Sequence, residues 1–110
     1  VVFSEEVYRG LYSSLKDDGI FVAQTESPFY YKDLLSRVSR TLKGIFPIVK
    51  TYVTVMPTYP GALWTFTLAS KKYDPATCVR HVDLETKFYT PELHKASFVL
   101  PKMVQDIVGA

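Results

Sequence analysis

GIFVAQTESP, residues 19–28, is the stretch that decides how this chain of 110 residues is expected to fold. Its apolar run, residues 20–23, carries no charge, and such a run is typical of a strand buried on both faces of a parallel sheet. Ser27 and Pro28 then predict the start of a helix, because Ser is a good N-cap and the first helical turn does not need the N–H that Pro lacks. In open α/β sheets, ligands collect beyond the carboxyl ends of the strands. Gln24 and Glu26 are therefore placed where a ligand is met.

A helix is expected on the N-terminal side of this strand, over residues 4–18. Ser4 is a good N-cap, and Glu5 and Glu6 favour the positive N-terminal end of a helix. The apolar residues of the segment repeat every four positions: Val7, Leu11 and Leu15. Gly19 is expected to end the helix in a conformation with positive φ, which other residues resist.

A second helix is expected after the strand, over residues 28–43. Apolar side chains form its predicted inner face: Leu34, Leu35, Val38 and Leu42. Its basic residues are interpreted as a solvated face: Lys32, Arg37, Arg40 and Lys43. Gly44 and Pro47 then stop the helix.

Two further strands are predicted, over residues 48–56 and 63–69, because apolar and polar residues alternate in both. The turn between them, residues 57–61, is short and rich in breakers, so it can join antiparallel strands but not parallel ones. Residues 71–90 are predicted to be irregular, and short helices are expected over 90–98 and 101–108.

The fold class expected from this order is α/β, with two parallel strands, an antiparallel last strand and flanking helices. These elements make up half of a doubly wound sheet. A buried strand that lacks a neighbour on one side exposes a long edge, which native proteins avoid. We therefore expect the missing strands to lie N-terminal to Val1, so that residues 1–110 form part of one larger domain.

The composition is typical of a globular chain with a core, since 47% of the residues are hydrophobic and 15% are aromatic. The net charge of +2 gives no strong field for nucleic acid or for an anionic membrane. No apolar run approaches the ~20 residues that a membrane-spanning helix needs. A single cysteine, Cys78, excludes an internal disulfide and a cysteine-built metal site, and cytoplasmic residence is expected.

Motifs of several site classes are missing from the sequence. There is no Gly-x-Gly-x-x-Gly and no P-loop, so no cofactor-binding residue is assigned. His81 and His94 have no Cys or carboxylate at metal-ligand spacing, so both are interpreted as structural or surface residues and no metal is expected. Ser27 is better explained as a cap than as a nucleophile, because no Gly-x-Ser-x-Gly elbow surrounds it.

Three features remain as candidates for a ligand site. Glu26, with Gln24, can hold an ammonium group, although an acidic residue at a helix N-terminus also compensates the helix dipole. Tyr59, in the turn Pro-Thr-Tyr-Pro-Gly, can wall a pocket or be an ordinary turn aromatic. Trp64 can stack on an alkyl chain or a cation, or simply pack in the core. Together these residues favour a slim, cationic, partly aliphatic ligand.

Three longer runs cover nearly the whole chain: LKDDGIFVAQTESP, IFPIVKTYVTVMPTYPGALWTFTLASKKYDP and DLETKFYTPELHKASFVLPKMV. They resemble the C-terminal part of the spermidine synthase (polyamine aminopropyltransferase) family. The resemblance implies a Rossmann-like catalytic domain of the methyltransferase type, of which this chain holds the C-terminal half: strands five, six and the antiparallel seven. The family's N-terminal β-domain, cofactor-binding half and acidic catalytic motif precede such a segment. None is present here, so no catalytic residue is assigned and the isolated segment is expected to be inactive.

The resemblance also implies a reaction and residue roles. The family transfers an aminopropyl group from the co-substrate decarboxylated S-adenosylmethionine to the diamine putrescine, without a metal, giving spermidine and 5′-methylthioadenosine. Gln24 and Glu26 match the family's Gln-x-Glu, which contacts the amino end of the diamine. Tyr59 and Pro60 match the Pro-Thr-Tyr-Pro turn that lines the substrate cleft, with Pro60 shaping the turn. Trp64 matches an aromatic residue beside the amine channel in bacterial and archaeal-type members.

Two kinds of alternative stay open. The parent enzyme can be a sibling that accepts agmatine, cadaverine or spermidine, or a diamine N-methyltransferase on the same scaffold. The chain can also be a non-catalytic piece that serves as an assembly surface, since it lacks the cofactor loop. The family resemblance implies a homodimer or homotetramer.

Overall fold

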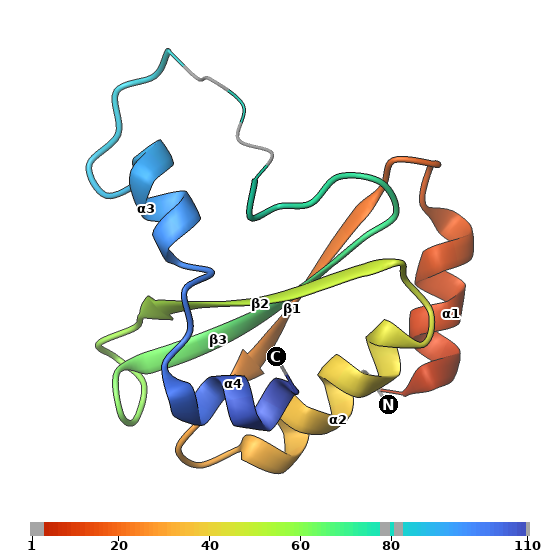
Figure 1. The fold of residues 1–110 in the computed structure, drawn as a ribbon, viewed down its shortest axis with the longest axis horizontal. Coiled ribbons are helices and arrows are strands. Elements are labelled where there is room, and N and C mark those ends of the chain that lie inside the picture. The colour runs from red at the N-terminus through yellow and green to blue at the C-terminus, as the bar shows by residue number, and fades with distance from the viewer. Residues whose placement is uncertain (1–3, 78–79, 81–82, 110) are drawn as a thin grey trace.

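The computed structural model describes residues 4–77, 80 and 83–109, and the order of helices and strands in them is the order expected from the sequence. The elements are α1 (Glu5–Ser14), β1 (Ile20–Glu26), α2 (Lys32–Lys43), β2 (Ile48–Val55), β3 (Leu63–Ser70), α3 (Pro91–Ala96) and α4 (Lys102–Val108) (Figure 1). Cys78 and His81 lie outside the described residues.

The sheet has the strand order β1-β3-β2, and β3 is antiparallel to both neighbours. β1 and β2 therefore point the same way, which confirms the expected two parallel strands and antiparallel last strand. The position of β3 between the other two was not evident from the sequence. It brings the carboxyl end of β1 beside the start of β3, where Glu26 pairs with Thr65.

β1 was expected to be buried on both faces, and this expectation was wrong. Its burial alternates: Ile20 and Val22 are 46% and 43% exposed, whereas Ala23 and Thr25 are buried. The physical reason is that the described helices packing on β1 cover only one face of the sheet, and that β1 hydrogen-bonds to β3 on one side only in the described part of the chain.

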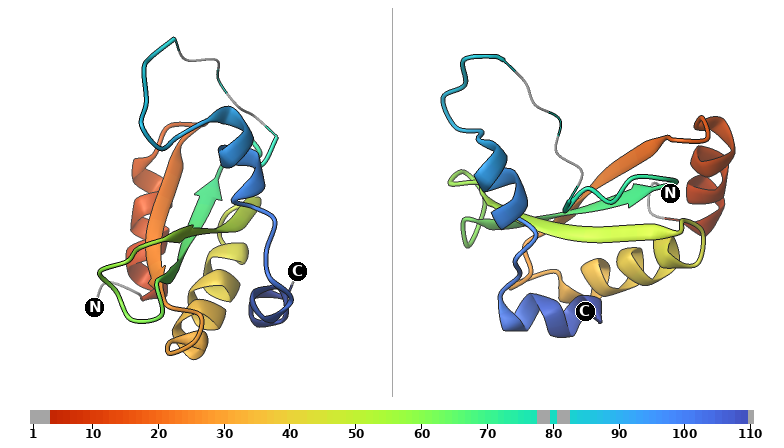
Figure 2. Two further views of the ribbon diagram at one scale, coloured as in Figure 1. Left: turned by 90° about the vertical axis from the view of Figure 1, so that its left-hand side faces the viewer. Right: turned by 45° about the horizontal axis from the view of Figure 1, so that its top comes forward.

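The main core lies between α1, α2 and the sheet face that they share. It contains Tyr8 of α1, Val38 and Leu42 of α2, and Ala69 of β3. A smaller cluster joins α2 to α4 through Leu35, Val104 and Val108. α2 and α4 lie on the same side of the sheet, while α3 lies beside the end where β2 turns into β3 (Figure 2). The expected inner face of α2 is thus confirmed, with Leu34 partly buried.

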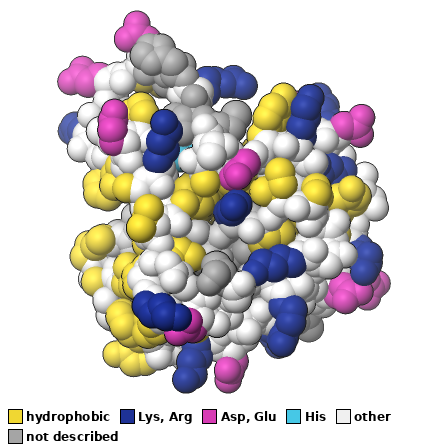
Figure 3. Space-filling model, in the orientation of Figure 1, with side chains coloured by type: hydrophobic (Ala, Val, Ile, Leu, Met, Phe, Trp, Pro, Cys, Tyr) yellow, Lys and Arg dark blue, Asp and Glu magenta, His cyan; other side chains and the backbone are white. Residues whose placement is uncertain are grey.

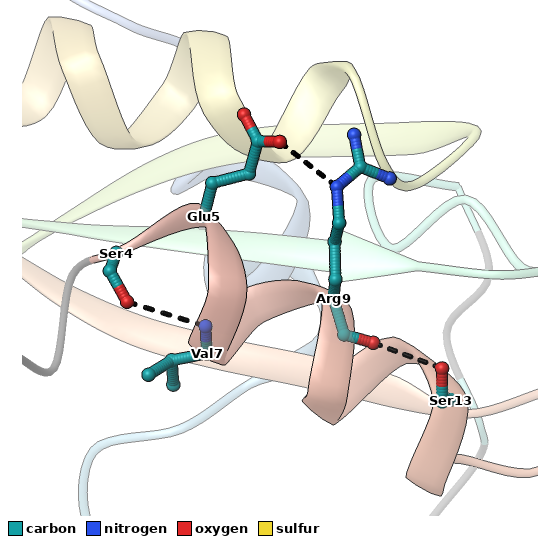
Figure 4. A network of polar contacts seen from close by, with 5 residues as sticks. All are labelled: Ser4, Glu5, Val7, Arg9 and Ser13. Carbon is teal, nitrogen blue, oxygen red and sulfur yellow. Dashed lines mark hydrogen bonds and ion pairs between the residues drawn. The ribbon is translucent and has the colours of Figure 1, made fainter.

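The start of α1 is built as the sequence predicted. The Val7 amide donates to the Ser4 hydroxyl at 3.3 Å, and Arg9 pairs with Glu5 at 3.0 Å one turn later (Figure 4). The buried face of the helix differs, because Tyr8 is 1% exposed and Val7 is 38% exposed. The helix also ends at Ser14 rather than near residue 18.

Gly19 was expected to adopt a positive φ, and it does not. Glycine is required here because a side chain would not fit: a Cβ at this position would lie 2.6 Å from the Leu15 Cβ and 3.0 Å from the Lys16 carbonyl oxygen. The turn between α1 and β1 is therefore packed too closely for any side chain.

Gly19→Ala is expected to lower the free energy of unfolding by about 1–3 kcal/mol, because the added methyl group overlaps a Cβ and a backbone oxygen. Gly10→Ala is the matched control, since nothing lies within 4 Å of a Cβ at this helical position. That change should stabilise the protein by about 0.8 kcal/mol through helix propensity. Denaturant unfolding measures the change in the free energy of unfolding for each variant. Equal changes in the two variants would contradict the crowding at Gly19.

α2 begins later than predicted, at Lys32 with Tyr31 as N-cap, instead of at Pro28 with Ser27 as N-cap. Residues 28–30 form a turn in which the Ser27 hydroxyl accepts from the Phe29 amide at 3.1 Å. Ser27 thus caps a turn and not a helix. The basic residues of α2 are exposed, as expected: Lys32, Arg37, Arg40 and Lys43.

On the face that Figure 3 draws, lysine and arginine side chains are scattered among acidic ones, so the charges form no continuous patch of one sign. This distribution agrees with the formal net charge of +2. The longest described helix, α2, has 12 residues. Across the described ranges, no helix has the length and apolarity that crossing a membrane requires.

Candidate functional site

The carboxyl ends of β1 and β2 meet at one end of the sheet, and this is where four of the five predicted site residues gather. Gln24 and Glu26 come from the end of β1, and Tyr59 comes from the turn that follows β2. Trp64 comes from the start of β3. The same turn reaches the segment after β1, since a Cβ on Gly61 would lie 3.1 Å from the Phe29 ring.

The fifth residue, Pro60, shapes the turn. Tyr59, Pro60, Gly61 and Ala62 form a tight turn in which the Ala62 amide donates to the Tyr59 carbonyl at 3.0 Å. Pro suits the second position of a type II turn, and the third position requires a positive φ, which Gly61 supplies at 81°. Pro60 is exposed. Pro60 thus helps to shape the turn that carries Tyr59.

Tyr59 and Trp64 stack on each other, with ring centroids 4.2 Å apart and an interplanar angle of 30°. Trp64 is 4% exposed, while Tyr59 is 38% exposed. The pair thus presents the phenol ring to solvent and keeps the indole beneath it. Such a stack supplies a rigid aromatic wall for a methylene chain or a cation.

The indole of Trp64 also orients Gln24. Its Nε1–H donates to the Gln24 Oε1 at 3.0 Å. Because an indole can only donate, the amide must turn its oxygen toward Trp64. That oxygen has a second lone pair, which is available to accept from another donor. Gln24 is exposed and so can present this lone pair to a ligand.

Glu26 sits at an irregularity in the sheet. The pairing of β1 with β3 shifts between Gln24 and Glu26, which is a β-bulge, and Glu26 has φ of 72°. A positive φ is uncommon for a residue other than glycine, and such strain clusters at functional sites. A bulge also re-aims the side chain that follows it. Glu26 does not lie in the first turn of α2, which starts six residues later, at Lys32, so compensation of the helix dipole is a poorer explanation for this residue.

Buried hydroxyl groups beside Glu26 were not singled out in the sequence. The Thr65 hydroxyl donates to the Glu26 carbonyl oxygen at 2.8 Å. Thr25 and Thr67 lie next to it and, like Thr65, are 0% exposed. The only signal in the sequence was the alternation of residues 63–69, which puts Thr65 and Thr67 on one face of the strand, and alternation alone does not distinguish a packed threonine from a functional one.

A separate cleft of about 490 Å³ lies between α3 and the sheet. Apolar and aromatic side chains dominate its lining, among them Tyr52, Val55, Leu63, Phe88, Leu93 and Phe98. None of the five predicted site residues lines it. Burial raises the pKa of the Tyr52 hydroxyl above its ordinary value of 10.0, so this phenol stays neutral at neutral pH and offers no base.

His94 has a structural position, as its sequence context suggested. Its Nε2 lies 2.7 Å from the Pro75 carbonyl oxygen and its Nδ1 lies 2.9 Å from the Tyr89 hydroxyl. The ring thereby ties α3 to the irregular segment that precedes it. In residues 4–77, 80 and 83–109, no group of three or more His, Cys, Asp or Glu side chains is arranged to hold a metal ion.

The chain is similar to one protein family along most of its length. A family profile described as "Spermine/spermidine synthase domain" matches residues 1–81. A polyamine aminopropyltransferase of Thermoanaerobacter sp. (strain X514) is 54% identical over 112 residues, covering 96% of this chain and 39% of that protein. One from Bacillus subtilis (strain 168) is 51% identical over 109 residues, covering 97% and 40%.

Solved structures give the same result. Spermidine synthase from Thermotoga maritima has a TM-score of 0.86 at 40% identity, covering 98% of this chain and 39% of that one. A spermidine synthase in complex with the transition state analogue AdoDATO also has a TM-score of 0.86 at 40% identity, covering 98% and 40%. The expected Rossmann-like fold of the methyltransferase type is confirmed by this similarity. The chain spans about two fifths of the length of the relatives that it matches.

Proposed function

The chain belongs to the spermine/spermidine synthase family, and from this membership we propose that it is the C-terminal part of the catalytic domain of a spermidine synthase. The parent enzyme transfers an aminopropyl group from decarboxylated S-adenosylmethionine to putrescine. The products are spermidine and 5′-methylthioadenosine. The segment supplies part of the diamine site.

The observation that carries this proposal is the contact of the Tyr59–Trp64 stack with Gln24, which lies two residues before Glu26 on β1. A diamine has two cationic ends joined by methylene groups, so its site needs an anion, hydrogen-bond acceptors and an apolar wall. Glu26 provides the carboxylate and Gln24 provides an amide oxygen whose orientation Trp64 sets. The stack provides the wall, with centroids 4.2 Å apart. These four residues match the chemistry of a slim cation.

The proposed reaction needs positioning above all. The amine nitrogen forms a bond to the carbon next to the sulfonium as the carbon–sulfur bond breaks, and the electron pair leaves with the thioether. The attacking amine must first lose a proton. Binding the far ammonium at Glu26 and Gln24 holds the near amine in line with that carbon, which converts an encounter in solution into an oriented one.

The rest of the site is proposed to lie outside these residues, because the chain spans about two fifths of its relatives. By the family resemblance, the proton-removing aspartate and the part that binds the donor precede this segment. Residues 1–110 then form the C-terminal part of a domain in which a further strand pairs with the edge of β1 that no strand of the described residues covers. We also propose a cytoplasmic homodimer or homotetramer, on the same resemblance.

The test is a panel of amines and donors given to the complete enzyme that contains this segment. Putrescine, cadaverine, agmatine and spermidine are each incubated with decarboxylated S-adenosylmethionine and, separately, with S-adenosylmethionine. Mass spectrometry of the products is expected to show aminopropylated putrescine and 5′-methylthioadenosine. Because a pocket discriminates one methylene group by about tenfold or more, kcat/KM for putrescine should exceed that for cadaverine by at least that factor.

Other outcomes would assign other functions. Preference for a different amine would make the enzyme a sibling aminopropyltransferase. Methylated products with S-adenosylmethionine would make it a diamine N-methyltransferase. Absence of turnover with every pair, in a folded protein, would favour the non-catalytic assembly role.

A further inference from the structure

Three buried threonines form a chain of hydroxyl groups that ends on the backbone of Glu26. The Thr67 hydroxyl lies 3.1 Å from the Thr25 hydroxyl, and the Thr25 hydroxyl lies 2.8 Å from the Thr65 hydroxyl. The Thr65 hydroxyl in turn lies 2.8 Å from the Glu26 carbonyl oxygen. All three threonines are 0% exposed. They join β1 to β3 across 39 to 42 positions of the chain.

The direction of every hydrogen bond in this chain follows from counting protons. A carbonyl oxygen can only accept, so the single proton of Thr65 points at Glu26. Thr65 then has no proton left for Thr25, and Thr25 must donate to Thr65. By the same count, Thr67 must donate to Thr25. The Thr65 hydroxyl is therefore used twice, as donor to Glu26 and as acceptor from Thr25.

We propose that Thr65 is a positioning residue for diamine binding: its hydroxyl holds the Glu26 carbonyl and, with it, the left-handed backbone that presents the Glu26 carboxylate. Glu26 has φ of 72° beside a β-bulge, a conformation that surrounding contacts must stabilise in a residue with a side chain. The hydrogen bond from Thr65 acts directly on this peptide unit. The inference rests on the proposed diamine site and adds a residue that touches no substrate.

Thr65→Val removes the hydroxyl and keeps the shape of the side chain. It leaves the Glu26 carbonyl without its donor and the buried Thr25 hydroxyl without its acceptor. In the complete enzyme, the KM for putrescine is expected to rise roughly fivefold, as for the loss of one hydrogen bond. The kcat and the KM for decarboxylated S-adenosylmethionine should be nearly unchanged. Thr65→Ser, which keeps the hydroxyl, is expected to restore the KM for putrescine.

Thr51→Val is the matched control. Thr51 is a buried threonine on β2, paired with Thr67 on the same sheet face but outside the hydroxyl chain. This variant should keep the KM for putrescine. Equal effects of Thr65→Val and Thr51→Val would overturn the proposal. So would a rise in the KM of the donor as large as that of putrescine, because a general loss of structure affects both substrates.

Two further measurements keep the test decisive. If Thr65→Val yields no soluble enzyme, Thr65→Cys replaces it, since a thiol is a weaker donor; an unchanged KM for putrescine in that variant would refute the role of Thr65. Glu26→Gln separates the two proposals. Unchanged putrescine kinetics in Glu26→Gln would refute the diamine site itself, whereas an effect there without one at Thr65 would refute only the positioning role.

Discussion

Glu26→Gln is expected to raise the KM for putrescine by about 10- to 100-fold in the complete enzyme. The change keeps the size of the side chain and removes its charge, so the ammonium loses a charge-assisted hydrogen bond worth about 1.5–3 kcal/mol. Binding of decarboxylated S-adenosylmethionine should stay nearly intact, because the proposed donor site lies outside this segment. Steady-state kinetics with each substrate varied in turn measures both values.

Glu6→Gln is a suitable control for the loss of one negative charge. Glu6 is exposed in the first turn of α1 and is not one of the predicted site residues. Its replacement should leave the KM of both substrates unchanged. If Glu26→Gln behaves like Glu6→Gln, the carboxylate at the end of β1 does not bind the diamine, and the assignment of this site is wrong.

Trp64→Leu is expected to raise the KM for putrescine by about tenfold, which corresponds to about 1.4 kcal/mol. The leucine keeps an apolar side chain, but Tyr59 loses its stacking partner and Gln24 loses the donor that orients its amide. Stability should also fall, by about 2–3 kcal/mol, because the indole is 4% exposed. Kinetics and denaturant unfolding are measured on the same preparation.

Tyr52→Leu separates binding from stability. Tyr52 stacks on Phe66 with centroids 5.1 Å apart and an interplanar angle of 11°, so this variant also loses a partly buried aromatic pair on the sheet. It is expected to lose stability while keeping the KM for putrescine. If both leucine variants shift that KM equally, the Tyr59–Trp64 stack serves only to pack the sheet.

Patterns of neighbouring residues predicted most elements of the fold. The alternation of residues 63–69 gave a strand with Trp64 and Thr65 on opposite faces, and the short turn before it required antiparallel pairing. Ser4 caps α1 as expected, and the helix expected from residue 90 is capped by Thr90, whose hydroxyl accepts from the Leu93 amide at 2.9 Å. These features depend on contacts within a few positions of the chain, which the order of residues already contains.

Two of the errors concern local backbone geometry, and the third depends on what packs against a strand from elsewhere in the chain. Gly19 was assigned a positive φ, but the approach of Leu15 explains it. Ser27 matched an N-cap, yet its hydroxyl caps a turn and α2 starts at Lys32. The run at residues 20–23 looked doubly buried, although how much of a strand is covered depends on what packs against it, not on its own composition.

For the candidate site, too, some features follow from the sequence and others only from the tertiary structure. The sequence alone determined its chemical groups: a carboxylate, an amide and two aromatic rings, placed at strand ends by local patterns and by the family resemblance. Tertiary structure decided how they act together, since Trp64 reaches Gln24 across 40 positions of the chain and Thr65 reaches the Glu26 carbonyl across 39. Those contacts exist because β3 inserts between β1 and β2. The register of that pairing, and the bulge that turns Glu26 out of the regular alternation, arise only when the strands meet.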